Sequence, residues 1–198
     1  MAGRLDLERT ALSYLETSAK HAGAIADEDT ASLVADAGSR MGRALAGGGR
    51  VLFCGNGGSA ADAQHLAAEL VGRLDASSDR GALAGVALTT DTSVMTSVAN
   101  DLGYDEVFAR QVEALGHRGD VLVCISTSGR SENVVRAARA ARERELDVVA
   151  LLGPGPSPLD DLAEPAIHLP GETSGQIQQG HVTVGHAMCL VAEAVVSA

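Results

Sequence analysis

The stretch that decides the fold reads Val51-Leu52-Phe53-Cys54-Gly55-Asn56-Gly57-Gly58-Ser59 and continues into an alanine-rich segment as far as Glu69. Its apolar residues predict a short buried strand, and its glycines predict a tight turn into a helix. A glycine turn of this kind brings backbone N–H groups close to a ligand at the positive end of the helix dipole. The stretch therefore predicts a strand–turn–helix unit that binds an anion.

The predicted helix carries a polar pair, His65 and Glu69. Residues at this spacing lie on one face of a helix, so the imidazole and the carboxylate can serve one acid/base or metal site. The alternative is an exposed polar pair with no role in chemistry. The His-x-x-x-His pattern with a central glutamate that marks zinc proteases is absent from this helix.

A second loop, residues 125–134, follows the apolar run 121–126 and also leads into a predicted helix. Side-chain hydroxyls and free amide N–H groups at such a helix start can hold a phosphate without a lysine. The alternative is a serine-rich turn with an ordinary helix cap. No Gly-Lys-Ser/Thr follows, which argues against nucleotide hydrolysis. The loop's hydroxyls belong to Ser126, Thr127, Ser128 and Ser131.

Short apolar runs alternate with helical stretches over residues 50–198, after two helices within residues 4–46. This order predicts an α/β fold, a doubly wound parallel sheet covered on both faces. We expect one domain over residues 1–198, with N-terminal helices in 1–46 and the α/β core in 50–198. Both loops follow strands, so they should share one crevice at the carboxyl edge of the sheet. The expected strands are 50–54, 84–88, 121–126, 148–152 and 166–169, and the expected core helices are 59–73, 92–115, 131–145 and 175–196.

Composition narrows the class of protein. A hydrophobic content of 45% with 21% charged residues is typical of a globular protein, and a net charge of −11 argues against nucleic acid or an anionic membrane as partner. No apolar stretch is long enough to span a bilayer, and the N-terminus lacks a signal sequence. The three cysteines lie in apolar segments without metal-type spacing, which favours reduced core residues in a cytoplasmic protein.

The last predicted helix adds Gln178, His181 and His186. In a straight helix Gln178 and His186 lie about 12 Å apart along the axis and about 80° apart around it, so only long side chains or an irregular helix start lets both reach one ligand. His181 lies about 140° from His186 around the axis, so we expect it outside that site. The alternative is that these histidines are exposed and have no role in a site, as is common for histidines on a helix.

Taken together, these motifs resemble those of the phosphoheptose (sedoheptulose 7-phosphate) isomerases, a family of sugar isomerase (SIS) domain proteins. The resemblance covers nearly the whole chain, including Thr90-Asp91. It implies a flavodoxin-like five-stranded sheet with an N-terminal helical extension, a homotetramer and one Zn²⁺ in each subunit. Its zinc ligands fall on His65, Glu69, Gln178 and His186. Its phosphosugar contacts fall on Asn56, Gly57, Gly58, Ser59, Glu69, Thr90, Asp91, Ser126, Thr127, Ser128, Ser131 and Gln178.

The chain departs from the family pattern just before and after Ile177-Gln178. The family usually has an arginine before this pair, often preceded by an acidic residue, whereas Gln176 and Gly175 stand here. A glutamate usually follows the pair, and here Gln179 does. The departures question any electrostatic role of this segment but leave the implied metal ligands intact.

The resemblance implies an aldose–ketose isomerase that converts sedoheptulose 7-phosphate to D-glycero-D-manno-heptose 7-phosphate through an enediol, with Glu69 and His186 as catalytic residues. One alternative is a non-catalytic SIS-domain adaptor that binds the replication initiator. In that relative the final histidine is replaced, so His186 favours the enzyme. Another alternative is a phosphosugar-sensing protein, but such domains usually accompany a DNA-binding helix-turn-helix, and this chain has no basic segment of that kind.

Overall fold

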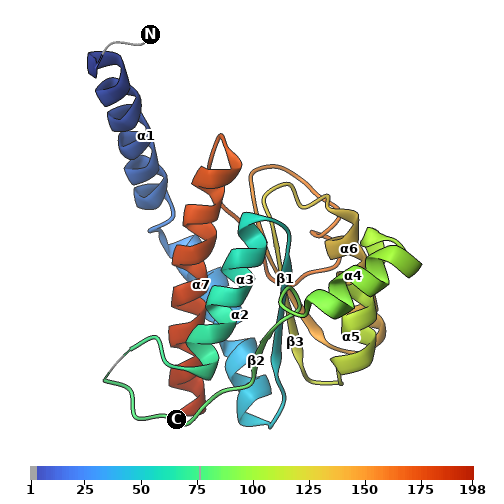
Figure 1. The fold of residues 1–198 in the computed structure, drawn as a ribbon. Coiled ribbons are helices and arrows are strands. Elements are labelled where there is room, and N and C mark those ends of the chain that lie inside the picture. Colours follow the sequence, from blue (N-terminus) through green and yellow to red (C-terminus); the bar gives the residue numbers. More distant parts are fainter. Residues whose placement is uncertain (1–3, 76) are drawn as a thin grey trace.

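The computed structural model describes residues 4–75 and 77–198, and its centre is a sheet flanked by helices (Figure 1). The sheet has five strands in the order β2-β1-β3-β4-β5. Each strand pairs with its neighbours in parallel. The predicted parallel α/β fold is therefore confirmed. The strands are β1 Val51–Gly55, β2 Gly85–Ala87, β3 Val121–Ser126, β4 Asp147–Leu152 and β5 Ala166–His168.

Helices cover both faces of the sheet, and alternate residues of each central strand point to opposite faces. Val51 and Phe53 of β1 pack with α2, α3 and α7, whereas Leu52 and Cys54 pack with α5 and α6. All three cysteines are buried and free, as expected. The helices are α1 Arg4–Ala24, α2 Glu28–Ala46, α3 Gly58–Val71, α4 Thr92–Asp101, α5 Ala109–Leu115, α6 Glu132–Glu143 and α7 Ser174–Val196, with a 3₁₀ turn, η1, at Tyr104–Glu106.

One predicted helix is wrong in extent. Residues 92–115 form two helices, α4 and α5, separated by η1. The break falls at Gly103, which has φ +99°, a backbone conformation that glycine adopts without steric cost and that ends a right-handed helix. Apolar periodicity on both sides of the glycine concealed the break.

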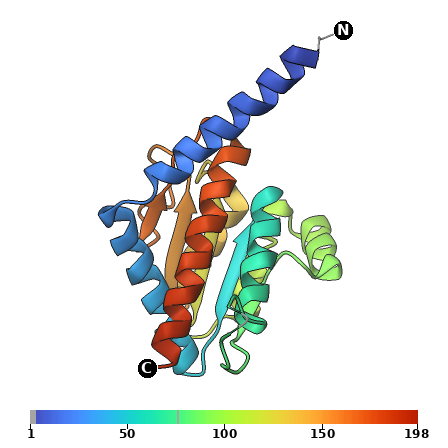
Figure 2. The same ribbon diagram turned by 90° about the vertical axis from the view of Figure 1, so that its left-hand side faces the viewer.

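The N-terminal helices differ in how they pack. Helix α2, capped by Asp27, lies along α7, and Gly38 allows the two helices to touch, since a Cβ there would stand 2.6 Å from the Cβ of Val191. The amino-terminal part of helix α1 extends away from the rest of the molecule, whereas its later part crosses the start of α7 (Figures 1 and 2). The predicted N-terminal extension therefore consists of one packed helix and one helix that projects at its amino end.

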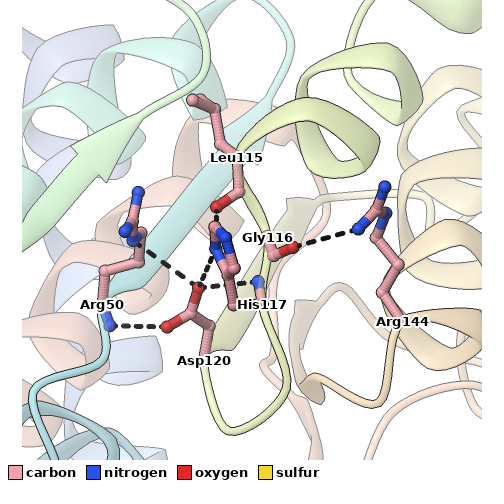
Figure 3. Close-up of polar contacts among 6 residues, drawn as sticks. All are labelled: Arg50, Leu115, Gly116, His117, Asp120 and Arg144. Atoms are coloured by element: carbon pink, nitrogen blue, oxygen red, sulfur yellow. Dashed lines mark hydrogen bonds and ion pairs between the residues drawn. The ribbon is translucent and has the colours of Figure 1, made fainter.

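A buried aspartate fixes the amino edge of the sheet (Figure 3). Asp120 accepts hydrogen bonds from the backbone N–H groups of Arg50 (2.8 Å) and His117 (3.0 Å), and the Arg50 side chain lies 3.6 Å from the same carboxylate. These contacts join the start of β1 to the turn before β3. Because β1 and β3 pair in register, their carboxyl ends then meet at the opposite edge of the sheet.

Among residues 4–75 and 77–198, no helix combines the length and the apolar character needed to cross a membrane.

Candidate active site

The two predicted loops meet in one crevice of about 290 Å³ at the carboxyl ends of β1 and β3, as the sequence predicted. It is polar, with hydroxyls, amides and backbone groups facing the space. The N-termini of α3, α6 and α7 all contribute residues to its wall. Its lining residues are Asn56, Gly57, Gly58, Ser59, Ile125, Ser126, Thr127, Ser131, Ser174 and Gln178.

The first loop needs its glycines for two reasons. Gly57 has φ +56°, in the left-handed region, and no side chain caps the helix that begins beside it. Gly58 leaves room for Gln178, whose side-chain amide lies 2.5 Å from where a Cβ of residue 58 would be. The start of α3 therefore lies at the crevice without a side-chain cap, and the positive end of its helix dipole favours an anionic ligand.

The second loop folds around Ser126, whose Oγ accepts a hydrogen bond from the Gly129 N–H at 3.1 Å. Ser131 precedes α6, but its side chain makes no capping hydrogen bond, so its hydroxyl is available to a ligand. Ser128 is exposed and its Oγ accepts from the Arg130 N–H at 3.2 Å, so it lies outside the lining of the crevice. The loop thus offers three hydroxyls to the crevice and a fourth beside it.

Two residues that the sequence analysis missed hold Asn56 in place. Asn133, buried on α6, exchanges two side-chain hydrogen bonds with Asn56 at 2.8 and 2.9 Å. The Tyr104 hydroxyl donates to the side-chain oxygen Oδ1 of Asn56 at 3.1 Å. The oxygen of Asn56 is thereby occupied twice, which leaves one side-chain N–H to donate to a ligand. Residues distant in sequence supply these contacts, so no local pattern could reveal them.

A second cluster joins α3 to α7. The Nε2 atoms of His65 and His186 lie 2.6 Å apart, and Glu69 Oε1 lies 3.5 Å from His65 Nε2. The helices pack closely here because Gly185 accepts the Leu66 side chain, which comes within 2.6 Å of where a Cβ would stand. The predicted shared face of His65 and Glu69 is present, and it faces His186.

The chemistry of this cluster fits a zinc-type metal ion. One ligand atom from each of the three side chains lies within 4.8 Å of the others, and two imidazole nitrogens with one carboxylate oxygen are donors that Zn²⁺ prefers. At 2.6 Å the two ring nitrogens share a hydrogen bond, and loss of its proton frees both lone pairs. Gln178 lies two turns earlier on α7, at the crevice wall.

Four predicted contacts lie apart from the crevice lining: Ser128 at its rim, Glu69 in the cluster with His65 and His186, and Thr90 with Asp91. Thr90 and Asp91 follow β2, at the same edge of the sheet, but both are exposed. The Asp91 carboxylate caps α4 by accepting from the Val94 N–H at 3.0 Å, and the Thr90 hydroxyl donates to the Ala87 carbonyl at 3.2 Å. Their role as substrate contacts stays a prediction.

The departures from the family pattern have structural explanations. Gln176 is buried and forms a capping box with Thr173, accepting from the backbone N–H groups of Glu172 and Thr173 at 2.9 and 3.1 Å. Gln179 donates to the Tyr14 hydroxyl at 3.3 Å. Gly175 lies beside the same hydroxyl. These positions fix the start of α7 and its contact with α1.

His181 is fully buried, contrary to the common exposure of helix histidines, and burial lowers its pKa to about 4. It does not belong to the His65–Glu69–His186 cluster, as the helical geometry predicted. Ser174 is a further residue of the crevice that was not predicted, and its Oγ lies 3.4 Å from the Thr127 hydroxyl. Its position directly after the capping residue Thr173 places it at a helix start, and this could have indicated a place in the crevice.

The fold and the crevice define an SIS-type α/β protein, and a family model described as SIS domain matches residues 13–153. A phosphoheptose isomerase from Bordetella avium is 57% identical over 149 residues, which cover 74% of this chain and 75% of the relative. The structure of a phosphoheptose isomerase from Neisseria gonorrhoeae superimposes with a TM-score of 0.87 at 39% identity, over 95% of this chain and 99% of that one. The structure of a phosphoheptose isomerase from Francisella tularensis superimposes with a TM-score of 0.86 at 33% identity, over 94% of this chain and 97% of that one. The chain therefore belongs to the phosphoheptose isomerase family of SIS-domain proteins.

Proposed function

We propose that this protein interconverts sedoheptulose 7-phosphate and D-glycero-D-manno-heptose 7-phosphate. The observation that carries the proposal is the convergence of His65, Glu69 and His186 on helices that also border the crevice. The family membership supports the same reaction. Isomerisation of a phosphosugar needs a binding site for the phosphate, which the crevice would supply, and an acid/base group at the reacting carbons, which the cluster would supply.

We assign phosphate binding to the loop 126–131. Ser126, Thr127 and Ser131 offer hydroxyls to the crevice, and the uncapped start of α6 adds backbone N–H groups and a favourable dipole. Ser128 remains a candidate contact at the rim. Binding energy from the remote phosphate would orient the reacting carbons, which raises the rate of the chemical step.

We assign the two proton transfers to Glu69 and His186. Isomerisation moves one proton between C1 and C2 and one between the two oxygens, through an enediol. A carboxylate and an imidazole at hydrogen-bond range of a bound sugar are suited to these transfers. Zn²⁺, one per subunit and held by His65, Glu69, Gln178 and His186, would polarise the sugar oxygens when bound.

Alternative functions are less well supported. An adaptor without catalysis has no need for a cluster of two histidines and a glutamate beside a polar crevice, and family membership favours the enzyme. A phosphosugar sensor would use the crevice but not the cluster. The net charge of −11 continues to argue against nucleic acid and anionic membranes as partners.

We propose a homotetramer on the basis of the N-terminal helices. The described part of α1 exposes Leu7 (62%) and Leu15 (64%) on a helix that projects from the rest of the molecule (Figure 2). An open apolar groove of about 650 Å³ lies between α7 and the corner that joins α1 to α2, lined by residues such as Ile25, Val34 and Val191. Exposed apolar surface of this extent is typical of protein–protein contacts.

We further propose a cytoplasmic location and a single domain over residues 1–198.

The test is incubation of the purified protein with sedoheptulose 7-phosphate, followed by NMR. We expect the aldose signals to grow until equilibrium. A protein loaded with Zn²⁺ that forms no aldose from this or any other heptose or pentose phosphate would contradict the proposal and favour the adaptor. Elemental analysis of the same preparation tests the metal separately, and a metal-free protein with full activity would refute the assignment of zinc.

A further inference from the structure

A buried arginine outside the crevice touches both helices of the acid/base cluster. Arg80 lies between α3 and β2, and its side chain is 5% exposed. One terminal nitrogen donates to the Glu69 carbonyl at 2.7 Å and to Glu193 Oε1 at 2.6 Å. The other donates to the carbonyls of Leu70 and Gly81, both at 2.9 Å.

These bonds complete the carboxyl end of α3. The last carbonyls of a helix lack partners within it, and α3 has no basic residue in its last turn. The Arg80 guanidinium supplies donors to two of these carbonyls and a positive charge at the negative end of the helix dipole. One of the two carbonyls belongs to Glu69, so the backbone of the proposed catalytic carboxylate is held directly.

The same guanidinium holds α3 to α7. Glu193, 9% exposed at its side chain, lies two helical turns after His186 and on the same side of α7. The two helices are therefore joined at two points: the pair His65–His186 and the pair Arg80–Glu193. Leu66 packs against Gly185 directly beside the histidine pair.

Cys189, buried on α7, supports this arrangement because the charges of both acids act on its thiol. Its pKa is raised to about 12, chiefly by burial and also by the negative charges of Glu69 and Glu193. Glu69, Glu193 and Arg80 thus all lie near the buried Cys189. A change in the Arg80 contacts would alter how Glu69 lies relative to His186.

We propose that Arg80 is a positioning residue of the acid/base cluster: its bonds to the Glu69 and Leu70 carbonyls and to Glu193 fix the carboxyl end of α3 against α7. This rests on the proposed isomerase function. Since small displacements of a catalytic group can cost roughly 10- to 100-fold in rate, we expect loss of these bonds to lower kcat by about that factor. KM should change little, because Arg80 contacts the carboxyl ends of α3 and α7, whereas the crevice is lined by the amino ends of these helices.

The decisive comparison uses Arg80→Met and the double variant Arg80→Met/Glu193→Met. The single variant leaves the Glu193 carboxylate buried without its partner and should be strongly destabilised. The double variant removes both charges and should regain much of the thermal stability. It still lacks the donors to the Glu69 and Leu70 carbonyls, so its kcat should stay low. Arg110→Met, which removes an exposed ion pair with Glu113 on α5, is the matched control and should retain wild-type kcat.

Recovery of kcat together with stability in the double variant would overturn the proposal, because a purely structural pair predicts that result. If Arg80→Met does not fold, the double variant alone still gives both kcat and thermal stability. A crystal structure of the double variant provides a test that is independent of turnover. We expect the 3.5 Å separation between Glu69 Oε1 and His65 Nε2 to change. An unchanged cluster would overturn the positioning role even if the wild type proved inactive on sedoheptulose 7-phosphate.

Discussion

The crevice and the acid/base cluster are neighbours that are built in different ways. The crevice consists mainly of two strand–turn–helix units, each continuous in the sequence. The cluster joins His65 and Glu69 of α3 to His186 of α7, which is 121 residues after His65. Binding groups thus come from local turns, whereas the acid/base groups depend on how two helices pack. The two regions should therefore respond differently to substitution.

The largest effect is expected in the cluster. Glu69→Gln keeps the shape of the side chain but removes the carboxylate, so kcat should fall about 100-fold or more, the usual contribution of a positioned acid or base. His186→Asn should have an effect at least as large and should also lower the zinc content. Steady-state kinetics and elemental analysis measure both.

The matched control for the cluster is Glu113→Gln, an exposed glutamate on α5. It should leave kcat unchanged. If Glu69→Gln were as active as this control within a few-fold, Glu69 could not be the base. Size-exclusion chromatography should give the same oligomer for all these variants, because one polar side chain at the cluster adds little to subunit packing.

A different kind of effect is expected in the crevice. Ser131→Ala removes a hydroxyl that makes no capping bond, so the fold should be kept while substrate binding weakens. A hydrogen bond to a charged group is worth about 1.5–3 kcal/mol, which corresponds to roughly a 10- to 100-fold rise in KM. Ser128→Ala should have a smaller effect, since Ser128 is exposed at the rim. Ser32→Ala on α2 serves as the control.

An unchanged KM for the double variant Ser128→Ala/Ser131→Ala would show that the phosphate binds elsewhere. A fall in kcat with unchanged KM would equally contradict the division between the two regions, because the hydroxyls would then act in the chemical step.

Gly58→Ala tests the border between the two regions. A Cβ at this position would displace the Gln178 amide, which lies 2.5 Å away at the end of a flexible side chain. We expect a folded protein with a several-fold loss of kcat/KM and weaker zinc binding. Gly23→Ala, at a position with open space around it, is the control. Wild-type activity of Gly58→Ala would remove Gln178 from the site.

The smallest effect on activity is expected at His181, which is buried outside both regions. Burial lowers its pKa to about 4, so the folded protein keeps it neutral while the unfolded chain binds a proton below about pH 6.5. Its contribution to stability is therefore present above pH 6.5 and is lost as the pH falls toward 4. Compared with His181→Leu, the wild type should lose about 1.6 kcal/mol more of its unfolding free energy between pH 6.5 and pH 5. Denaturant titrations at both pH values measure this difference, and parallel losses in the two proteins would contradict it.

Burial of Asp62 acts in the opposite direction and raises its pKa to about 6. Its neutral form is favoured in the folded protein, so its contribution to stability is lost as the pH rises from about 4 through 6. The comparison with His181→Leu avoids this complication because Asp62 is present in both proteins.

The contrast between the regions also explains what the sequence could predict. Strand–turn–helix patterns are local, so the parallel sheet, the shared crevice and the helical face of His65 and Glu69 were predicted correctly. The hydrogen bonds of Asn133 and Tyr104 with Asn56 arise from tertiary packing, so no local sequence pattern predicts them. The break at Gly103 was missed because apolar periodicity continues past it, and only the positive φ reveals it. The meeting of His186 with α3 came from the family resemblance and not from helical geometry.

Isomerisation in D₂O tests whether the side chains that α3 and α7 bring together transfer protons on a sugar held in the crevice. The cluster is partly open to solvent, with side-chain exposures of 44% for His65 and 18% for Glu69, so the transferred proton should exchange. We predict that NMR will show aldose carrying deuterium at C2 for the wild type and negligible aldose for Glu69→Gln. An aldose without deuterium, or equal conversion by the two proteins, would contradict the account.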